Sequence, residues 1–275
     1  MIMEYRKLNN NTEIPVVGYG VYQTPPSKTM QLVLEALDNG YRHIDTAQNY
    51  ANEHEVDKAI KASGVNREEV FVTTKTQTNG YANTIKGIDK SLDEFGFDYF
   101  DLILIHWPNG DDIDTYHALE DAYDDGKARA IGLSNYNSRQ FNEILESCSI
   151  KPAVCQIETH ILWQQQKMHE YLLEKDCMHM AWSPFASGYM DIFNNQLLRD
   201  IAESHEKSVG QVMLKYLLQQ DITPIPKSTN VGRMKENIDI FDFKLSRDEL
   251  NQIRGLDQRK SYCNWPSAMK EESNY

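Results

Sequence analysis

The chain has 275 residues, with 28 basic and 41 acidic side chains and a formal net charge of −13. This length suits a single α/β barrel with a large apolar core. The acidic balance disfavours nucleic acid and anionic membranes as partners, because both require a basic footprint. The four cysteines lack metal-ligand spacing, so we expect reduced thiols in a cytoplasmic protein without a bound metal. We also expect no signal peptide and no membrane span, since no apolar run approaches ~18 residues.

Short apolar runs alternate with amphipathic segments along the chain. Residues 1–14 begin it, and Tyr5–Ile14 with its Asn-rich turn predicts a small hairpin that would close the bottom of a barrel. Strands are then predicted at Val16–Val21, Tyr41–Asp45, Val70–Lys75, Tyr99–His106, Ala130–Ser134, Ala153–Glu158, Met178–Trp182 and Thr223–Pro226. Helices are predicted at residues 30–39, 53–63, 84–95, 114–125, 138–148, 165–175, 195–219 and 231–240. A capping box predicts an extra helix over Ser246–Arg254.

Eight strands that alternate with eight helices indicate the α/β class and a (β/α)8 TIM barrel. A doubly wound sheet would also alternate, but eight units in about 240 residues leave no room for the second domain that often accompanies it. We therefore expect one domain over residues 1–275. The irregular tail at 259–275 is expected to lie over the barrel mouth, with Trp265 as its apolar anchor.

Polar or ionisable side chains stand at the predicted carboxyl ends of strand after strand, where barrel enzymes build their active sites. Asp45 and Lys75 would pair there, because buried charges are costly unless paired. Tyr50 follows Asp45 by five positions and can return over the mouth towards Lys75 and His106. A phenol is a competent proton donor at neutral pH, and a neighbouring ammonium would lower its pKa towards the operating range. With His106 orienting the substrate oxygen, this set predicts protonation of a carbonyl oxygen as it becomes an alkoxide.

Such a reaction needs a hydride, which no side chain supplies, so a nicotinamide cofactor is predicted. Gly18–Gln23 begins like a dinucleotide fingerprint but lacks its third glycine and a proper βαβ unit, so a Rossmann site is rejected. Ile225–Asn230 is the better candidate, because it ends the last strand and opens a helix, where barrels commonly bind phosphate. Lys227 and Arg233 add two cations there, which favours the 2′-phosphate of NADPH.

A nicotinamide site can also be predicted at the barrel mouth. Ser134, Asn135 and Gln156 offer donors and acceptors for a carboxamide, and Trp182 offers a flat face for the ring. Each of these residues lies within the last three positions of a predicted strand or directly after one.

Three motif regions resemble those of the aldo-keto reductases, over essentially the whole chain: Gly40–Ala47 through Glu53, Ile131–Tyr136, and Ile225–Ser228 with Arg233, Glu236 and Asn237. The chain is most similar to the bacterial subgroup that contains 2,5-diketo-gluconate and methylglyoxal reductases. The resemblance implies a catalytic set of Asp45, Tyr50, Lys75 and His106. It implies a cofactor site of Gly20, Val21, Tyr22, Asp45, Ser134, Asn135, Gln156, Trp182, Ser183, Phe185, Ser187, Ile225, Lys227, Ser228, Thr229, Arg233, Glu236 and Asn237. The expected substrate site comprises Tyr22, Tyr50, His106, Trp107 and Trp265.

The chain departs from the family pattern at a few positions outside the catalytic set. Asp57 replaces a usual glycine, Cys155 replaces an asparagine, and Thr159 and Ile161 replace a tyrosine and a proline. Tyr22 stands where tryptophan is frequent, and only about five residues separate Trp107 from the next predicted helix. The departures bear on the substrate range, and the short segment after Trp107 predicts an open, permissive pocket. The expected substrates are small carbonyl compounds such as keto-sugars and 2-oxoaldehydes.

Two other functions fit the same barrel. A regulatory nucleotide sensor is disfavoured by the intact catalytic set and by the absence of an N-terminal interaction arm. A Schiff-base aldolase that uses Lys75 is disfavoured because Asp45 would keep this lysine protonated. We expect a monomer, since no heptad run or long amphipathic seam is visible.

Overall fold

The computed structural model describes residues 3–188 and 191–263. A parallel sheet forms its centre, with strands adjacent in chain order from β3 to β10. The strands are β3 Tyr19–Gly20, β4 His43–Asp45, β5 Phe71–Thr76, β6 Leu102–Ile105, β7 Ile131–Ser134, β8 Val154–Glu158, β9 Met178–Trp182 and β10 Thr223–Ile225. The amides of Gly18 and Gly20 donate to the carbonyls of Pro224 and Pro226, each at 3.0 Å, so the first and last strands meet. The predicted (β/α)8 TIM barrel is confirmed.

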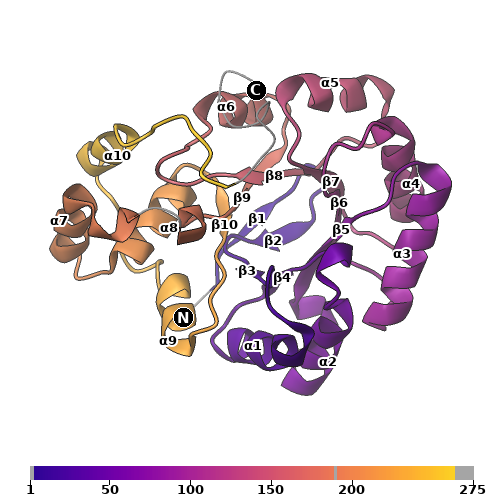
Figure 1. The fold of residues 1–275 in the computed structure, drawn as a ribbon, viewed down its shortest axis with the longest axis horizontal. Coiled ribbons are helices and arrows are strands. Elements are labelled where there is room, and N and C mark those ends of the chain that lie inside the picture. Colours follow the sequence, from indigo (N-terminus) through magenta and orange to yellow (C-terminus); the bar gives the residue numbers. More distant parts are fainter. Residues whose placement is uncertain (1–2, 189–190, 264–275) are drawn as a thin grey trace.

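Helices surround the strands, as Figure 1 shows. They are α1 Pro26–Asp38, α2 Glu53–Ser63, α3 Tyr81–Phe95, α4 Asp112–Asp124, α5 Ser138–Ser147, α6 Gln166–Glu174, α7 Gln196–Ser204, α8 Val209–Gln219, α9 Val231–Ile238 and α10 Arg247–Arg254. Short 3-10 turns lie at Gln48–Tyr50, Arg67–Glu69, Ala186–Gly188 and Ile192–Asn194. Helices α7 and α10 pack on each other at the outside of the ring. No helix of the described residues is long and apolar enough to cross a bilayer.

The helix predicted over 195–219 is wrong as one element, because the structure contains two helices there, α7 and α8. Glu206 has a left-handed backbone, with φ of 54°, which ends the helical path. Ser208 then starts α8 with a capping box: its hydroxyl accepts from the Gln211 amide at 3.2 Å, and Gln211 accepts from the Ser208 amide at 2.9 Å. The apolar pattern continues across this turn because both helices bury one face against the same cluster.

Other boundaries shift by smaller amounts. Helix α1 begins at Pro26, four positions before the predicted start, where proline suits the first helical turn. Strand β3 retains only two residues of the predicted Val16–Val21 run, although the whole run is buried. Burial alone therefore does not distinguish a strand from the extended segment that leads into it. The extra helix is confirmed, with Ser246 and Glu249 forming the predicted capping box.

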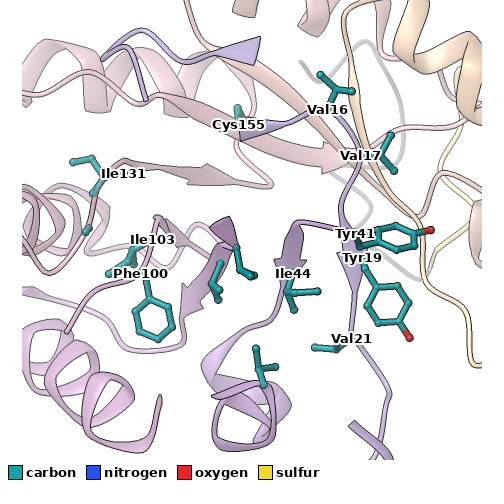
Figure 2. Packing of buried hydrophobic residues seen from close by; sticks show 14 of the residues in the cluster. Val16, Val17, Tyr19, Val21, Tyr41, Ile44, Phe100, Ile103, Ile131 and Cys155 are labelled. Atoms are coloured by element: carbon teal, nitrogen blue, oxygen red, sulfur yellow. The ribbon is translucent and has the colours of Figure 1, made fainter. Parts of the chain in front are cut away.

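The hairpin is also confirmed, as β1 Tyr5–Lys7 and β2 Glu13–Pro15 pair antiparallel. Leu8 and Ile14 belong to one buried cluster with side chains from inside the barrel, including Phe71, Leu104 and Val154. The hairpin therefore closes the bottom of the barrel, as its sequence predicts. A second apolar layer packs outside the strands, where Figure 2 shows residues such as Ile44, Ile103 and Cys155. A barrel closed and packed in this way leaves only its mouth open for a site.

Candidate active site

A buried ion pair lies at the carboxyl ends of β4 and β5. The Lys75 ammonium donates to Asp45 Oδ1 at 2.6 Å and to the Thr46 carbonyl at 2.9 Å. The other Asp45 oxygen accepts from Gln156 Nε2 at 2.7 Å. Burial lowers the pKa of Lys75, and the Asp45 carboxylate opposes this shift. The pair forms because neither charge tolerates burial alone.

Tyr50 and His106 lie directly beside this pair. The Lys75 nitrogen is 5.3 Å from the centre of the Tyr50 ring, and the Tyr50 and His106 rings are 5.8 Å apart. The ring of Tyr22 lies 5.1 Å from that of Tyr50. The structure thus brings together Asp45, Tyr50, Lys75 and His106, although they come from four different segments of the chain.

The protonation states differ in part from the sequence-based expectation. Burial, together with the Asp45 charge, raises the pKa of Tyr50 well above its ordinary value of 10.0. The expected lowering of this pKa is therefore wrong for this structure, because burial penalises the charged phenolate. Burial and the Lys75 charge lower the pKa of His106 to about 3. At neutral pH the site accordingly holds a protonated phenol and a neutral imidazole.

A cleft of about 960 Å³ opens above these side chains. This volume is typical of a site for a cofactor together with a substrate. The expected site residues that line it are Gly20, Tyr22, Asp45, Tyr50, His106, Trp107, Ser134, Asn135, Gln156, Trp182, Ser183, Phe185, Ser187, Ile225, Lys227, Ser228, Thr229, Arg233, Glu236 and Asn237. Val21 is buried and does not line the cleft, and Lys75 lies beneath it. Trp265 lies outside the described residues.

Sequence reasoning missed a further set of cleft residues: Gln23, Asn49, Pro184, Gly188, Phe193, Ser208, Val209, Gly210 and Cys263. Ser208, Val209 and Gly210 belong to the turn and helix start that the single predicted helix concealed. The Ser-x-x-Gln capping pattern at Ser208 is a sequence signal that would have revealed this turn. Cys263 belongs to the tail that the sequence predicts over the barrel mouth, but no feature of the sequence singles out this residue for the cleft.

Within the part of the chain that the structure describes, the polar side chains in the middle of the cleft include one with hydrogen-bond partners, Asn135, and one without, Ser134. Asn135, in a left-handed conformation with φ of 70°, donates to the His106 carbonyl at 2.9 Å and accepts from the Trp182 indole at 2.9 Å. Asn135 therefore connects the ends of three strands. Ser134, in contrast, has a buried hydroxyl without a hydrogen-bond partner among the described residues, although it lines the cleft. Such a hydroxyl suits a bound amide group.

The far end of the cleft carries two cations, Lys227 and Arg233, both on exposed residues. Neither forms an ion pair within residues 3–188 and 191–263. One amide of the α9 start is already in use, because Asn230 caps the helix and accepts from the Arg233 amide at 3.0 Å. The cationic side chains are therefore better placed than that amide to receive an anionic group.

Comparison with known proteins identifies this arrangement. The model of the Aldo/keto reductase family matches residues 16–258. The chain belongs to this family. It is an oxidoreductase that acts on carbonyl groups, as the resemblance predicts, and the mouth of its barrel is the candidate active site.

Individual relatives cover almost the whole chain. A 9,11-endoperoxide prostaglandin H2 reductase of Trypanosoma cruzi is 42% identical over 92% of this chain and 91% of its own length. A glyoxal reductase of Bacillus subtilis is 43% identical over 92% of each chain. Among solved structures, an aldo-keto reductase from a deep-sea metagenome library matches with a TM-score of 0.92 and 38% identity, covering 95% of this chain and 99% of its own. A Bombyx mori aldo-keto reductase in complex with NADP has a TM-score of 0.91 and 32% identity, covering 98% and 96%.

Proposed function

We propose that this protein reduces small aldehydes and ketones to alcohols with NADPH, and that Tyr50 is the proton donor. The observation that carries the proposal is the set formed by the buried Asp45, Lys75 and His106 and the partly buried Tyr50 at the floor of the cleft. The proposed substrates are small aldehydes and ketones, including keto-sugars and 2-oxoaldehydes. A relative that is a glyoxal reductase supports this class.

In this mechanism each side chain has a distinct task. The neutral His106 ring donates a hydrogen bond to the carbonyl oxygen and orients it. Tyr50, which the raised pKa keeps protonated, gives its proton to the same oxygen. The Lys75 ammonium, held in place by Asp45, stabilises the negative charge that this transfer leaves on the phenol oxygen. A bound reduced nicotinamide would supply the hydride.

The residues along the cleft fit such a cofactor. Ser134 offers an unused hydroxyl for the carboxamide, beside Asn135 and Gln156. Trp182 lies next to them and would contact the ring. Lys227 and Arg233 at the far end would bind the 2′-phosphate, with Ser228, Thr229, Glu236 and Asn237 around the adenosine. A relative of known structure in complex with NADP supports this assignment.

The alternative functions find less support in the geometry. Lys75 is 1% exposed and donates to both Asp45 and Thr46, so it is poorly placed to attack a carbonyl as an amine. A test should therefore separate reduction from Schiff-base chemistry and from cofactor binding alone. Covalent trapping of a carbonyl substrate by borohydride would indicate a Schiff-base aldolase. Failure of generic aldehydes to turn over would indicate a protein that only binds the nucleotide.

The direct experiment follows NADPH oxidation with methylglyoxal, glyoxal, benzaldehyde and a keto-sugar as substrates. We expect steady turnover with at least one of the small aldehydes. The proposal is wrong if NADPH binds but none of these compounds is reduced. We also propose a monomer, so sedimentation should give a mass near 31.8 kDa, and a mass twice as large would contradict it.

A further inference from the structure

Glu158 is a buried carboxylate that the mechanism above does not use. It ends β8, two positions after Gln156, and only 1% of its surface is exposed. No lysine or arginine of the described residues forms an ion pair with it. A carboxylate buried without a cation is costly, so its hydrogen bonds must satisfy it. The identity of these partners therefore indicates what the residue does.

One oxygen of Glu158 is bound to a histidine whose orientation is set by the backbone. His160 Nδ1 accepts from the amides of Leu162 and Trp163, at 3.3 and 3.1 Å. The proton of the neutral ring is therefore on Nε2, which donates to Glu158 Oε1 at 3.0 Å. This contact joins the end of β8 to the loop that follows it, and it fixes the carboxylate in one orientation.

The other oxygen reaches a distant segment. Ser261, 103 positions further along the chain and 5% exposed, donates its hydroxyl to Glu158 Oε2 at 2.6 Å. The same hydroxyl oxygen accepts from the Cys263 amide at 3.2 Å. A second contact holds this segment nearby, where the Gln258 amide donates to the Leu162 carbonyl at 2.9 Å. Because its acceptor is charged, the Ser261 bond is the stronger kind of hydrogen bond.

The segment that Glu158 binds forms a wall of the cleft. Cys263 lines the cleft, and its sulfur lies 3.4 Å from the Ser187 hydroxyl and 3.8 Å from the Ser183 hydroxyl. These serines follow β9 beside Trp182, on the side where the nicotinamide is proposed to bind. Movement of the segment would therefore change the shape of the cleft without altering Asp45 or Tyr50.

We propose that Glu158 is a positioning residue, which through Ser261 holds residues 258–263 on the barrel rim and so places the Cys263 wall of the cleft. The tether itself is independent of the proposed function. Its effect on turnover rests on that function, and the two are tested by separate measurements.

The thiol of Cys263 reports the position of the segment in the protein without cofactor. Burial and the nearby Glu158 carboxylate raise the pKa of this thiol from its ordinary 9.0 to about 11. The thiolate is the form that reacts with alkylating agents. If the segment left the rim completely, the pKa of Cys263 would return to about 9, and its alkylation rate at pH 8 would increase by about a hundredfold. We expect Ser261→Ala to increase the alkylation of Cys263 by iodoacetamide at least about tenfold, measured by peptide mass spectrometry. Cys148, which is partly exposed and outside the cleft, serves as the internal reference.

Three further variants separate the tether from general stability. Glu158→Gln keeps the shape of the side chain but removes its charge, which weakens the hydrogen bond to Ser261 and also removes one cause of the raised Cys263 pKa, so alkylation should increase in this variant as well. Ser261→Thr retains the hydroxyl and should restore slow alkylation. Ser246→Ala removes the cap of α10 and loosens the same end of the chain, yet it does not touch Glu158. Cys263 in Ser246→Ala should therefore react as it does in the unchanged protein.

Turnover supplies the second measurement. Ser261→Ala should raise the KM for a small aldehyde about three- to tenfold with kcat within about twofold, because the reacting groups stay in place. The tether is refuted if Cys263 reacts no faster in Ser261→Ala, or equally fast in Ser246→Ala. Faster alkylation with an unchanged KM would refute the role of the wall in the cleft. If the unchanged protein reduces no carbonyl compound, the proposed function fails, and the alkylation series still decides on the tether.

Discussion

The Tyr50→Phe substitution removes the phenol oxygen and keeps the ring beside Lys75 and His106. The hydroxyl of Tyr50 has no hydrogen bond to other described residues, and the ring supplies the contacts with its neighbours. The substitution should therefore leave the fold and cofactor binding almost unchanged. Loss of activity can then be assigned to the missing proton donor.

A positioned proton donor contributes ~10²–10⁴ in rate, which corresponds to about 3–5 kcal/mol of activation free energy. We expect kcat to fall by at least ~10² in Tyr50→Phe, because phenylalanine has no proton to give at this position. His106, whose ring lies 5.8 Å from that of Tyr50, has a pKa lowered to about 3 and is a weak proton source at neutral pH. Tyr22→Phe is the matched control, since its ring lies 5.1 Å from that of Tyr50. Its kcat should change by less than about threefold.

The assay follows NADPH oxidation with methylglyoxal and measures the Kd for NADPH by fluorescence in all three proteins. The raised pKa of Tyr50 also predicts that loss of this proton does not reduce the rate between pH 6 and 9, well below the ordinary phenol pKa of about 10. A Tyr50→Phe variant that turns over at the unchanged rate would show that Tyr50 is not the acid. Equal losses in Tyr50→Phe and Tyr22→Phe would point to disturbed packing of the aromatic pair instead.

Three more predictions concern the cofactor, the ion pair and acid stability. Arg233→Ala should weaken NADPH binding about ten- to a hundredfold and leave NADH binding nearly unchanged, since only NADPH carries the 2′-phosphate. Equal losses of affinity for the two cofactors in fluorescence titrations would contradict this prediction. Lys75→Met should lower the free energy of unfolding by about 3–5 kcal/mol in urea titrations, because it leaves the Asp45 carboxylate buried and unpaired; a loss below about 1 kcal/mol would refute the argument. Burial lowers the pKa of His43 from 6.5 to about 3, so between these pH values the unfolded chain binds more protons than the folded one. Stability from this residue is complete above pH 6.5 and is lost by up to ~1.4 kcal/mol per pH unit as the pH falls towards 3. Urea titrations from pH 7.5 to 4 should therefore give a shallower slope for His43→Gln, and parallel curves would exclude the effect.

The sequence by itself determined the fold class and the chemistry at the strand ends. Eight alternations of apolar runs and amphipathic segments indicate the barrel because each pattern reflects which face an element buries. The positions of Asp45, Lys75 and His106 follow from the rule that barrel sites lie at the carboxyl ends of strands. The hairpin and the extra helix were likewise visible, since turn and cap residues act over a few positions.

Only the tertiary structure decided the features that depend on contacts between distant segments. The turn that divides α7 from α8 interrupts no apolar periodicity, so its place on the cleft appears only when both helices pack. The pKa of Tyr50 rises because of desolvation in the folded mouth and the nearby Asp45 charge, and the extent of desolvation cannot be read from spacing. The contact of Glu158 with Ser261 joins residues 103 positions apart. Local sequence specifies the elements and the residue types at their ends, whereas desolvation and long-range hydrogen bonds exist only after the chain has closed around them.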